Sequence, residues 1–188
     1  MTVLFDGELD VLESYFSIEA AQARFGDLAD AFAGQQNGLC GAALSGRLAF
    51  ITGLPIGRVP LQVEALSGSP DLNAEWEDVV EASFQSAGDV RLRDWSGLQS
   101  WRLALPEGPL RVRYCLRGMD LVRDRSARRG GLPTVTPHLI QFWPAPLTRD
   151  AVVKQGSMTA ASWHQAWAPG RKWRDVRTHG VRGGATPA

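Results

Sequence analysis

The clearest alternation of apolar and polar residues runs through residues 99–117. On residues 110–117, apolar side chains alternate with arginine or cysteine, so the strand they predict has one core face and one cationic face. The core face carries Leu110, Val112, Tyr114 and Leu116. The other face carries Arg111, Arg113, Cys115 and Arg117. Pro106-Glu107-Gly108-Pro109 has turn chemistry, so residues 99–117 predict a β-hairpin whose basic face is wet.

Similar patterns predict further strands at residues 8–18, 47–52, 58–66, 76–85, 89–94 and 138–143. Phe25, Leu28 and Phe32 have helical spacing, and Asp27 and Gly34 mark the ends of a short helix near 27–33 that would bury its phenylalanines. A second helix is predicted over 157–168, capped by Ser157. The fold class expected is mainly β, an antiparallel β-sandwich of eight to ten strands with one or two short helices.

The length of 188 residues suits one domain, and we expect a single β-sandwich domain over residues 1–168 followed by a basic, flexible tail over 169–188. Residues 120–133 are predicted to form a mobile basic loop. Two cysteines are too few for a disulfide framework. No membrane-length apolar run occurs, and the first residues lack the pattern of a signal peptide, so a cytoplasmic protein is expected.

Six arginines fall on predicted outward faces of neighbouring strands, and they are the candidate binding residues: Arg91, Arg93, Arg102, Arg111, Arg113 and Arg117. If these strands pair, their guanidinium groups crowd one surface and repel each other unless carboxylates or a ligand lie among them. Glu77, Glu81 and Glu107 are the local candidates for such carboxylates. Trp143 and Trp173 are candidate anchors at the edge of this surface.

The formal net charge of zero conceals an asymmetry along the chain. Residues 1–90 hold 14 acidic residues and three arginines, whereas residues 91–188 hold six acidic and 17 basic residues. In the simpler interpretation, the two halves pack together and offset each other. In the functional interpretation, a basic face meets an acidic partner. Nucleic acid is one such partner, but a pI near 6.8 and the acidic first half weigh against it.

Motifs of enzymes and metal sites are missing from the sequence. His138, His164 and His179 are far apart, and none has a metal-ligand spacing with a cysteine. Because the chain also lacks nucleophile-elbow, phosphate-loop and dinucleotide motifs, no catalytic residue, cofactor or metal is predicted. A catalytic triad assembled from distant residues around His138 or His164 stays open.

Several segments together resemble a family of bacterial hypothetical proteins that is common in actinobacteria. They are Asn37–Ala43, Thr52–Leu54, Trp76–Ser83, Leu105–Gly108 leading into Arg111–Cys115, and Gln141–Pro146. The chain departs from that family's pattern at Pro55 and at Pro137-His138. The stretches Trp76–Glu81 and Leu105–Gly108 also resemble the competence protein J family, which inhibits the DNA-entry nuclease. This second resemblance implies a β-sandwich that acts by binding a protein rather than by catalysis.

The function predicted from the sequence is a cytoplasmic protein-binding module of the inhibitor or immunity type. Its basic sheet face would occlude an acidic protein partner, such as a nuclease or a toxin. The alternative is a small-molecule or carbohydrate-binding β-sandwich, or an enzyme, with a pocket lined by Trp95, Trp101 and Trp143. The sequence leaves the oligomeric state open.

Overall fold

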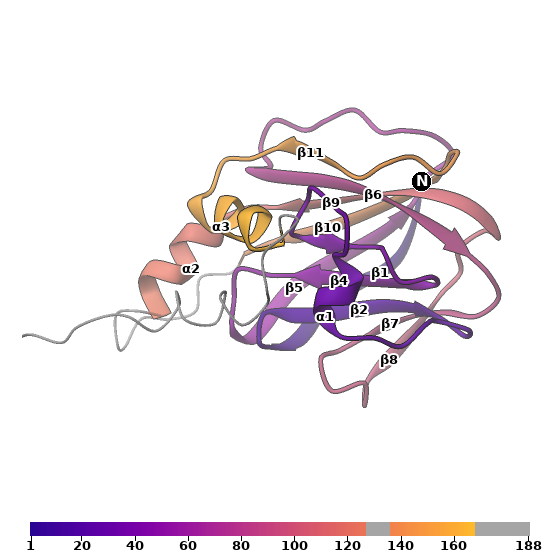
Figure 1. Ribbon diagram of the computed structural model, residues 1–188, viewed down its shortest axis with the longest axis horizontal. Helices are drawn as coiled ribbons and strands as arrows, with labels where there is room; N and C mark the ends of the chain where they lie inside the picture. The colour runs from indigo at the N-terminus through magenta and orange to yellow at the C-terminus, as the bar shows by residue number, and fades with distance from the viewer. Residues whose placement is uncertain (127–135, 168–188) are drawn as a thin grey trace, which may run out of the picture.

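The computed structural model describes residues 1–126 and 136–167 (Figure 1). The predicted tail at 169–188, with Trp173, and residues 127–133 of the predicted basic loop lie outside these residues. The described residues form eleven strands and three helices, so the prediction of a mainly β fold is confirmed. The strands are β1 (Thr2–Leu12), β2 (Tyr15–Ala20), β3 (Cys40–Gly41), β4 (Arg47–Ile51), β5 (Ile56–Ala65), β6 (Asp78–Ser86), β7 (Val90–Arg93), β8 (Ser100–Leu103), β9 (Gly108–Leu116), β10 (His138–Pro144) and β11 (Ala151–Lys154). The helices are α1 (Leu28–Ala31), α2 (Met119–Ser126) and α3 (Met158–Ala166).

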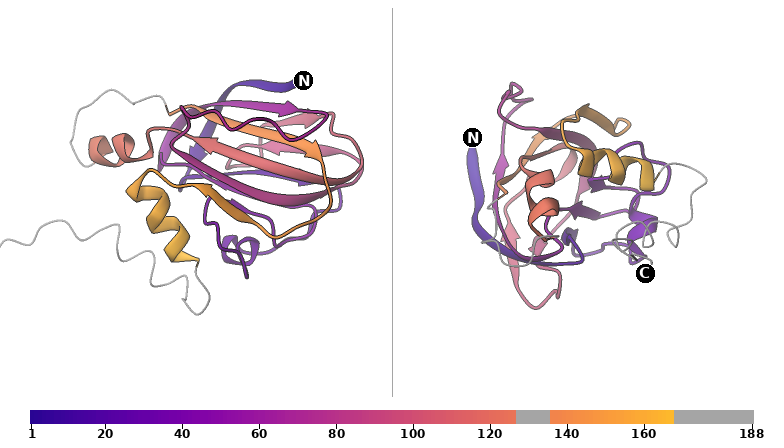
Figure 2. Two further views of the ribbon diagram at one scale, coloured as in Figure 1. Left: turned by 90° about the horizontal axis from the view of Figure 1, so that it is seen from above. Right: turned by 90° about the vertical axis from the view of Figure 1, so that its left-hand side faces the viewer.

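The strands form one curled, open sheet rather than the predicted antiparallel sandwich (Figures 1 and 2). Its order is β11-β6-β9-β10-β5-β1-β2-β4-β3, with β7 beside β2 and β8 beside β7. The sheet is mixed because β10 runs parallel to β5, whereas the other neighbours are antiparallel. The curled sheet forms a half-barrel. The alternation of residues along single strands does not distinguish a half-barrel from a sandwich.

The corner between β1 and β2 joins the two parts of the curl. β1 pairs with β5 along almost its whole length but with β2 only at Leu12 and Tyr15. Glu13 and Ser14, with φ of 55° and 61°, form a tight left-handed turn between the two strands. The single strand predicted over residues 8–18 is thus wrong, because this turn divides it and frees β2 to pair with β4 and β7.

Aromatic residues fill the core where the curl brings β4 towards β9. Phe16 and Phe50 stack with ring centroids 4.9 Å apart, and the ring of Tyr114 meets that of Phe50 edge-on at 5.0 Å. The Tyr114 hydroxyl donates to the carbonyl oxygen of Ile51 at 3.3 Å. All four residues are buried, so strands distant in the sheet order share one core.

The hairpin predicted over residues 99–117 is wrong, although both of its strands exist. β8 pairs with β7, at Trp101 opposite Leu92, whereas β9 pairs with β6 and β10. The Pro-Glu-Gly-Pro segment therefore joins strands in separate parts of the sheet instead of closing a hairpin. Because β9 has neighbours on both sides and is covered on both faces, Leu110–Leu116 are buried throughout.

The two predicted helices are confirmed. The amide of Asp27 donates to Asp30 Oδ2 at 2.9 Å at the start of α1, and Ser157 Oγ accepts from the amide of Ala160 at 3.0 Å at the start of α3. Phe32 is buried as expected and its ring stacks on that of Trp167 at 4.7 Å. Phe25 is 88% exposed instead, because it precedes the first residue of α1 and lies in irregular chain.

Helices α2 and α3 lie together at one end of the sheet (Figure 2). Asp120 accepts three hydrogen bonds at the start of α3, from the amide of Met158 and from the amide and hydroxyl of Thr159. Residues 120–126 are helical where a loop was predicted. Within the described parts of the chain, no helix has the length and apolar character needed to cross a membrane.

Candidate functional site

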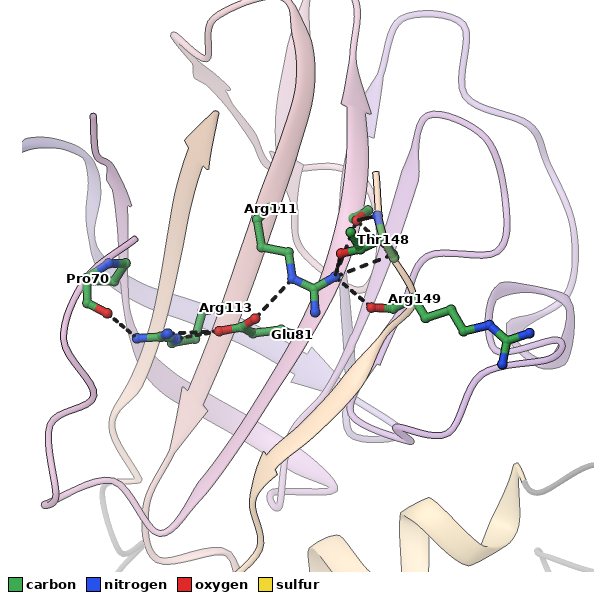
Figure 3. Close-up of polar contacts among 7 residues, drawn as sticks. Pro70, Glu81, Arg111, Arg113, Thr148 and Arg149 are labelled. Atoms are coloured by element: carbon green, nitrogen blue, oxygen red, sulfur yellow. Dashed lines mark hydrogen bonds and ion pairs between the residues drawn. The ribbon is translucent and has the colours of Figure 1, made fainter. Parts of the chain in front are cut away.

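Arg111 and Arg113, predicted to face solvent, are buried on the outer face of β9. Glu81 of β6 lies between them and accepts from Arg111 Nε at 3.0 Å and from Arg113 Nε at 2.9 Å (Figure 3). Arg111 Nη1 also donates to Thr148 Oγ1 at 2.9 Å, and Arg113 Nη1 donates to the carbonyl of Pro70 at 2.9 Å. The prediction of a wet basic face is therefore wrong for β9.

The burial has a structural cause that lies outside β9. The segments that carry Pro70 and Thr148 lie on opposite sides of the arginine pair and supply oxygen acceptors to it (Figure 3). The guanidinium carbon of Arg113 also lies 5.3 Å from the ring centroid of Trp143, which is itself buried. The protein therefore buries Arg111, Arg113 and Trp143 instead of exposing them to solvent.

The buried arginines belong to a neutral row across four strands. Gln141 of β10 lies between Arg113 and Glu64 of β5, and its amide donates to Glu64 Oε2 at 2.9 Å. Two acids and two arginines thus offset each other. Cys115 shares the arginine face, where burial raises the pKa of its thiol to about 12. Cys115 and Cys40 are both free.

Three of the six candidate arginines do come together at the surface. Arg91 and Arg93 of β7 and Arg102 of β8 have side chains that are 41%, 38% and 75% exposed. Arg91 is the cross-strand partner of both Arg102 and Glu19. We call the group Glu19, Asp89, Arg91, Arg93 and Arg102 the arginine surface. Arg117 is exposed beyond the end of β9.

Two carboxylates hold the arginine surface together. Asp89 Oδ2 lies 2.7 Å from Arg91 Nε, and Asp89 Oδ1 lies 3.1 Å from Arg102 Nε. Glu19 Oε2 lies 3.1 Å from Arg93 Nε. Neither Glu77 nor Glu107 takes part, so the predicted carboxylates were wrong here and right only for Glu81. Acids from the first half of the chain pair with arginines of the second, as the simpler interpretation of the charge asymmetry expected.

Arg47 of β4 is a fourth arginine beside the arginine surface, but it serves the fold. Its Nε lies 3.4 Å from Glu19 Oε1, while its terminal nitrogens donate to the Tyr15 hydroxyl at 2.6 Å and to the Gly26 carbonyl at 3.1 Å. The last bond holds the irregular segment 21–26 in place beside β2. That segment forms one wall of a groove.

The groove has a volume of about 240 Å³ and lies along the arginine surface. It is lined by Glu19, Ala20, Ala21, Ala23, Phe25, Asp89, Arg91 and Arg93. Three of these residues are small alanines, and the exposed ring of Phe25 lines the groove with them. Phe25 was not among the predicted binding residues, because its helical spacing indicated a core residue. The cap at Asp27 was the available signal, since a residue before the cap lies outside the helix.

The tryptophans of the alternative pocket lie on different elements with different contacts. Trp143 lies over Arg113, whereas Trp101 meets the ring of Phe5 edge-on at 5.1 Å. Trp95, in the loop between β7 and β8, is half-exposed. The ring contacts of the described residues include none that joins these three indoles.

The two described histidines are neutral parts of the structure. Burial lowers the pKa of His138 to about 4, and its ring stacks on that of Tyr114. Burial also lowers the pKa of His164, whose Nδ1 accepts from the amide of Gly38 at 2.8 Å. In residues 1–126 and 136–167, no three histidine, cysteine or acidic side chains are grouped so that they could hold a metal ion.

Comparisons with known proteins agree with this architecture. No protein-family model and no curated protein matches the chain. The solved structure of ComJ, inhibitor of the DNA degrading activity of NucA, from Bacillus subtilis, is similar with a TM-score of 0.51 and 14% identity, covering 77% of this chain and 98% of ComJ. The chain has a ComJ-like fold. The crocagin biosynthetic gene J protein also aligns, with a TM-score of 0.45 and 12% identity over 76% of this chain and 99% of its own.

Proposed function

We propose that the protein is a binding module of the inhibitor type that occludes a nuclease partner with its arginine surface. The observation that carries this proposal is the contrast in how the arginines use their donors. Among the described residues, no acceptor takes a hydrogen bond from the terminal nitrogens of Arg93 or Arg102. Partly exposed arginines with unused donors on adjacent strands suit the recognition of carboxylates on another protein.

The ComJ-like fold supports the choice of partner. ComJ inhibits the DNA degrading activity of NucA. Transfer of that role to the present chain is part of the proposal, because 14% identity carries the fold alone.

The mechanism proposed is occlusion of the nuclease cleft. A cleft that cuts DNA with a metal ion contains carboxylates, and the arginine surface offers complementary charge. The arginines are held on strands by Asp89 and Glu19, so little ordering is needed on binding. The two free, buried thiols are compatible with a reducing compartment, and the proposal places the complex in the cytoplasm.

The test compares wild type with Arg91→Gln/Arg93→Gln/Arg102→Gln as immobilised bait in extract of the native host. Arg58→Gln is the matched control, since Arg58 is 67% exposed and pairs with Asp10 on another part of the sheet. We expect wild type and control to retain one protein in a 1:1 complex, and the purified protein to suppress the DNA-degrading activity of its partner. Retention of the same nuclease by the triple variant would overturn the proposal.

A further inference from the structure

We infer that the groove beside Phe25 receives a short acidic segment of a protein partner, with one carboxylate bound by Arg91 and Arg93 and an apolar side chain packed on Phe25. The inference rests on the proposed function for its biological setting. It goes further by assigning the occupant of the groove and a contact residue that lies outside the arginine surface.

Unused hydrogen-bond donors are the first observation. A guanidinium group has five N–H donors, and the described polar contact of Arg93 is the ion pair of its Nε with Glu19 Oε2 at 3.1 Å. Arg91 uses Nε on Asp89, and its only other described bond is a long one of 3.5 Å from Nη1 to the Ser100 hydroxyl. Both side chains line the groove, so the terminal nitrogens of Arg93 and Nη2 of Arg91 are available to a carboxylate that enters it.

Charge is the second observation, and it selects a peptide over a nucleic acid. Arg91 and Arg102 lie directly opposite each other on neighbouring strands, where like charges are unfavourable, and Asp89 is shared between them. A further carboxylate would offset the remaining positive charge. A continuous phosphate chain fits less well, because it brings several negative charges beside Glu19 and Asp89, which line the same groove, whereas the inferred segment brings one carboxylate.

Phe25 is the third observation. The ring of Phe25 is 88% exposed and lines the same groove of about 240 Å³ as Arg91 and Arg93. Aromatic and arginine side chains dominate the energy of protein interfaces. Ala20, Ala21 and Ala23 leave space beside the ring for an apolar side chain from the partner.

The experiment measures peptide binding by fluorescence anisotropy. The probes are fluorescein-labelled heptapeptides of the form Gly-Gly-Φ-Asp-Φ-Gly-Gly, in which Φ is Leu, Phe or Trp. The same peptides with Asn in place of Asp, and a single-stranded DNA 12-mer, serve as controls. We expect at least one Asp peptide to bind, its Asn counterpart to bind at least about tenfold more weakly, and the DNA to bind more weakly than the peptide.

Variants then locate the binding. We expect Arg91→Gln/Arg93→Gln and Phe25→Ala each to weaken binding of the Asp peptide by about tenfold or more. The control Arg58→Gln should change the affinity by less than about twofold. These side chains are partly or largely exposed, so an unchanged thermal midpoint is expected for every variant.

The outcomes separate the inference from the proposed function. If no Asp peptide binds while nuclease capture still depends on the arginine surface, the inference is overturned and the proposed function stands. If Asp peptides bind in the groove but no nuclease is captured, the inference is supported and the proposed function fails. Tighter binding of DNA than of every Asp peptide, or Asp peptides that bind Phe25→Ala unchanged, would overturn the inference.

Discussion

The chain uses two pairs of arginines, each sharing one carboxylate, in opposite ways. Glu81 joins Arg111 and Arg113 beneath the chain segments that cover β9, and Asp89 joins Arg91 and Arg102 at the surface. The inner pair, Arg111 and Arg113, donates hydrogen bonds from its terminal nitrogens to Thr148 and to backbone carbonyls. The side chains of the outer pair, Arg91 and Arg102, are 41% and 75% exposed. Alternation along a strand thus fixes the direction of an arginine, whereas distant segments decide whether it stabilises the fold or meets a partner.

The largest expected effect comes from removing the carboxylate of the inner pair. Glu81→Gln leaves two arginines buried without their counter-charge, and we expect the free energy of unfolding to fall by about 3–5 kcal/mol. Urea denaturation measures it. The control Glu107→Gln, on an exposed turn, should change it by less than about 0.5 kcal/mol. A loss below about 1 kcal/mol for Glu81→Gln would show that the inner pair is solvated like the outer one.

Lowering the pH should reduce the stability of the fold without weakening binding at the arginine surface. The folded protein holds His138 neutral with a pKa of about 4, whereas the unfolded chain protonates it near pH 6.5, so protons favour unfolding between these values. The contribution of neutral His138 to the free energy of unfolding is complete above pH 6.5. It falls as the pH drops, by about 2 kcal/mol at pH 5. The arginines stay charged throughout, and peptide binding should persist.

Urea denaturation at pH 7 and pH 5 tests this, with His138→Phe as the comparison because phenylalanine keeps a ring against Tyr114. Wild type should lose more stability than the variant over this range. Parallel losses in the two proteins would mean that His138 does not carry the effect.

The smallest expected effect concerns the outer pair. A double-mutant cycle with Asp89→Ala and Arg102→Ala should give a coupling free energy below about 1 kcal/mol, because the Arg102 side chain is 75% exposed. Raising the salt concentration to 0.5 M should reduce this coupling further. A salt-insensitive coupling as large as the effect of Glu81→Gln would erase the distinction between the two pairs.

Local patterns predicted much of the secondary structure. Strands β4 to β7 fall within a few residues of their predicted ranges, and Asp27 and Ser157 begin the expected helices. These features follow from alternation and capping, which are local. The turn at Glu13 and Ser14 was missed because neither residue is a glycine or asparagine, the usual signals of a left-handed turn.

Long-range pairing explains the remaining differences. The alternation of β9 is the same for a hairpin arm as for a strand between β6 and β10. The segments with Pro70 and Thr148 have no pattern that relates them to Arg111 and Arg113. The sequence therefore indicated the six candidate arginines, but the division into buried and exposed groups required the fold.

The parallel pairing of β5 with β10 also affects how the protein is made. Residue 65 ends β5 and residue 138 begins β10, so at 5–20 residues per second the ribosome needs roughly 4–15 s to add the partner strand. During this interval β1 can pair with one side of β5, while its other side remains an open edge. Open edges template intermolecular pairing, so a nascent chain that pauses between these strands should be the form most dependent on chaperones.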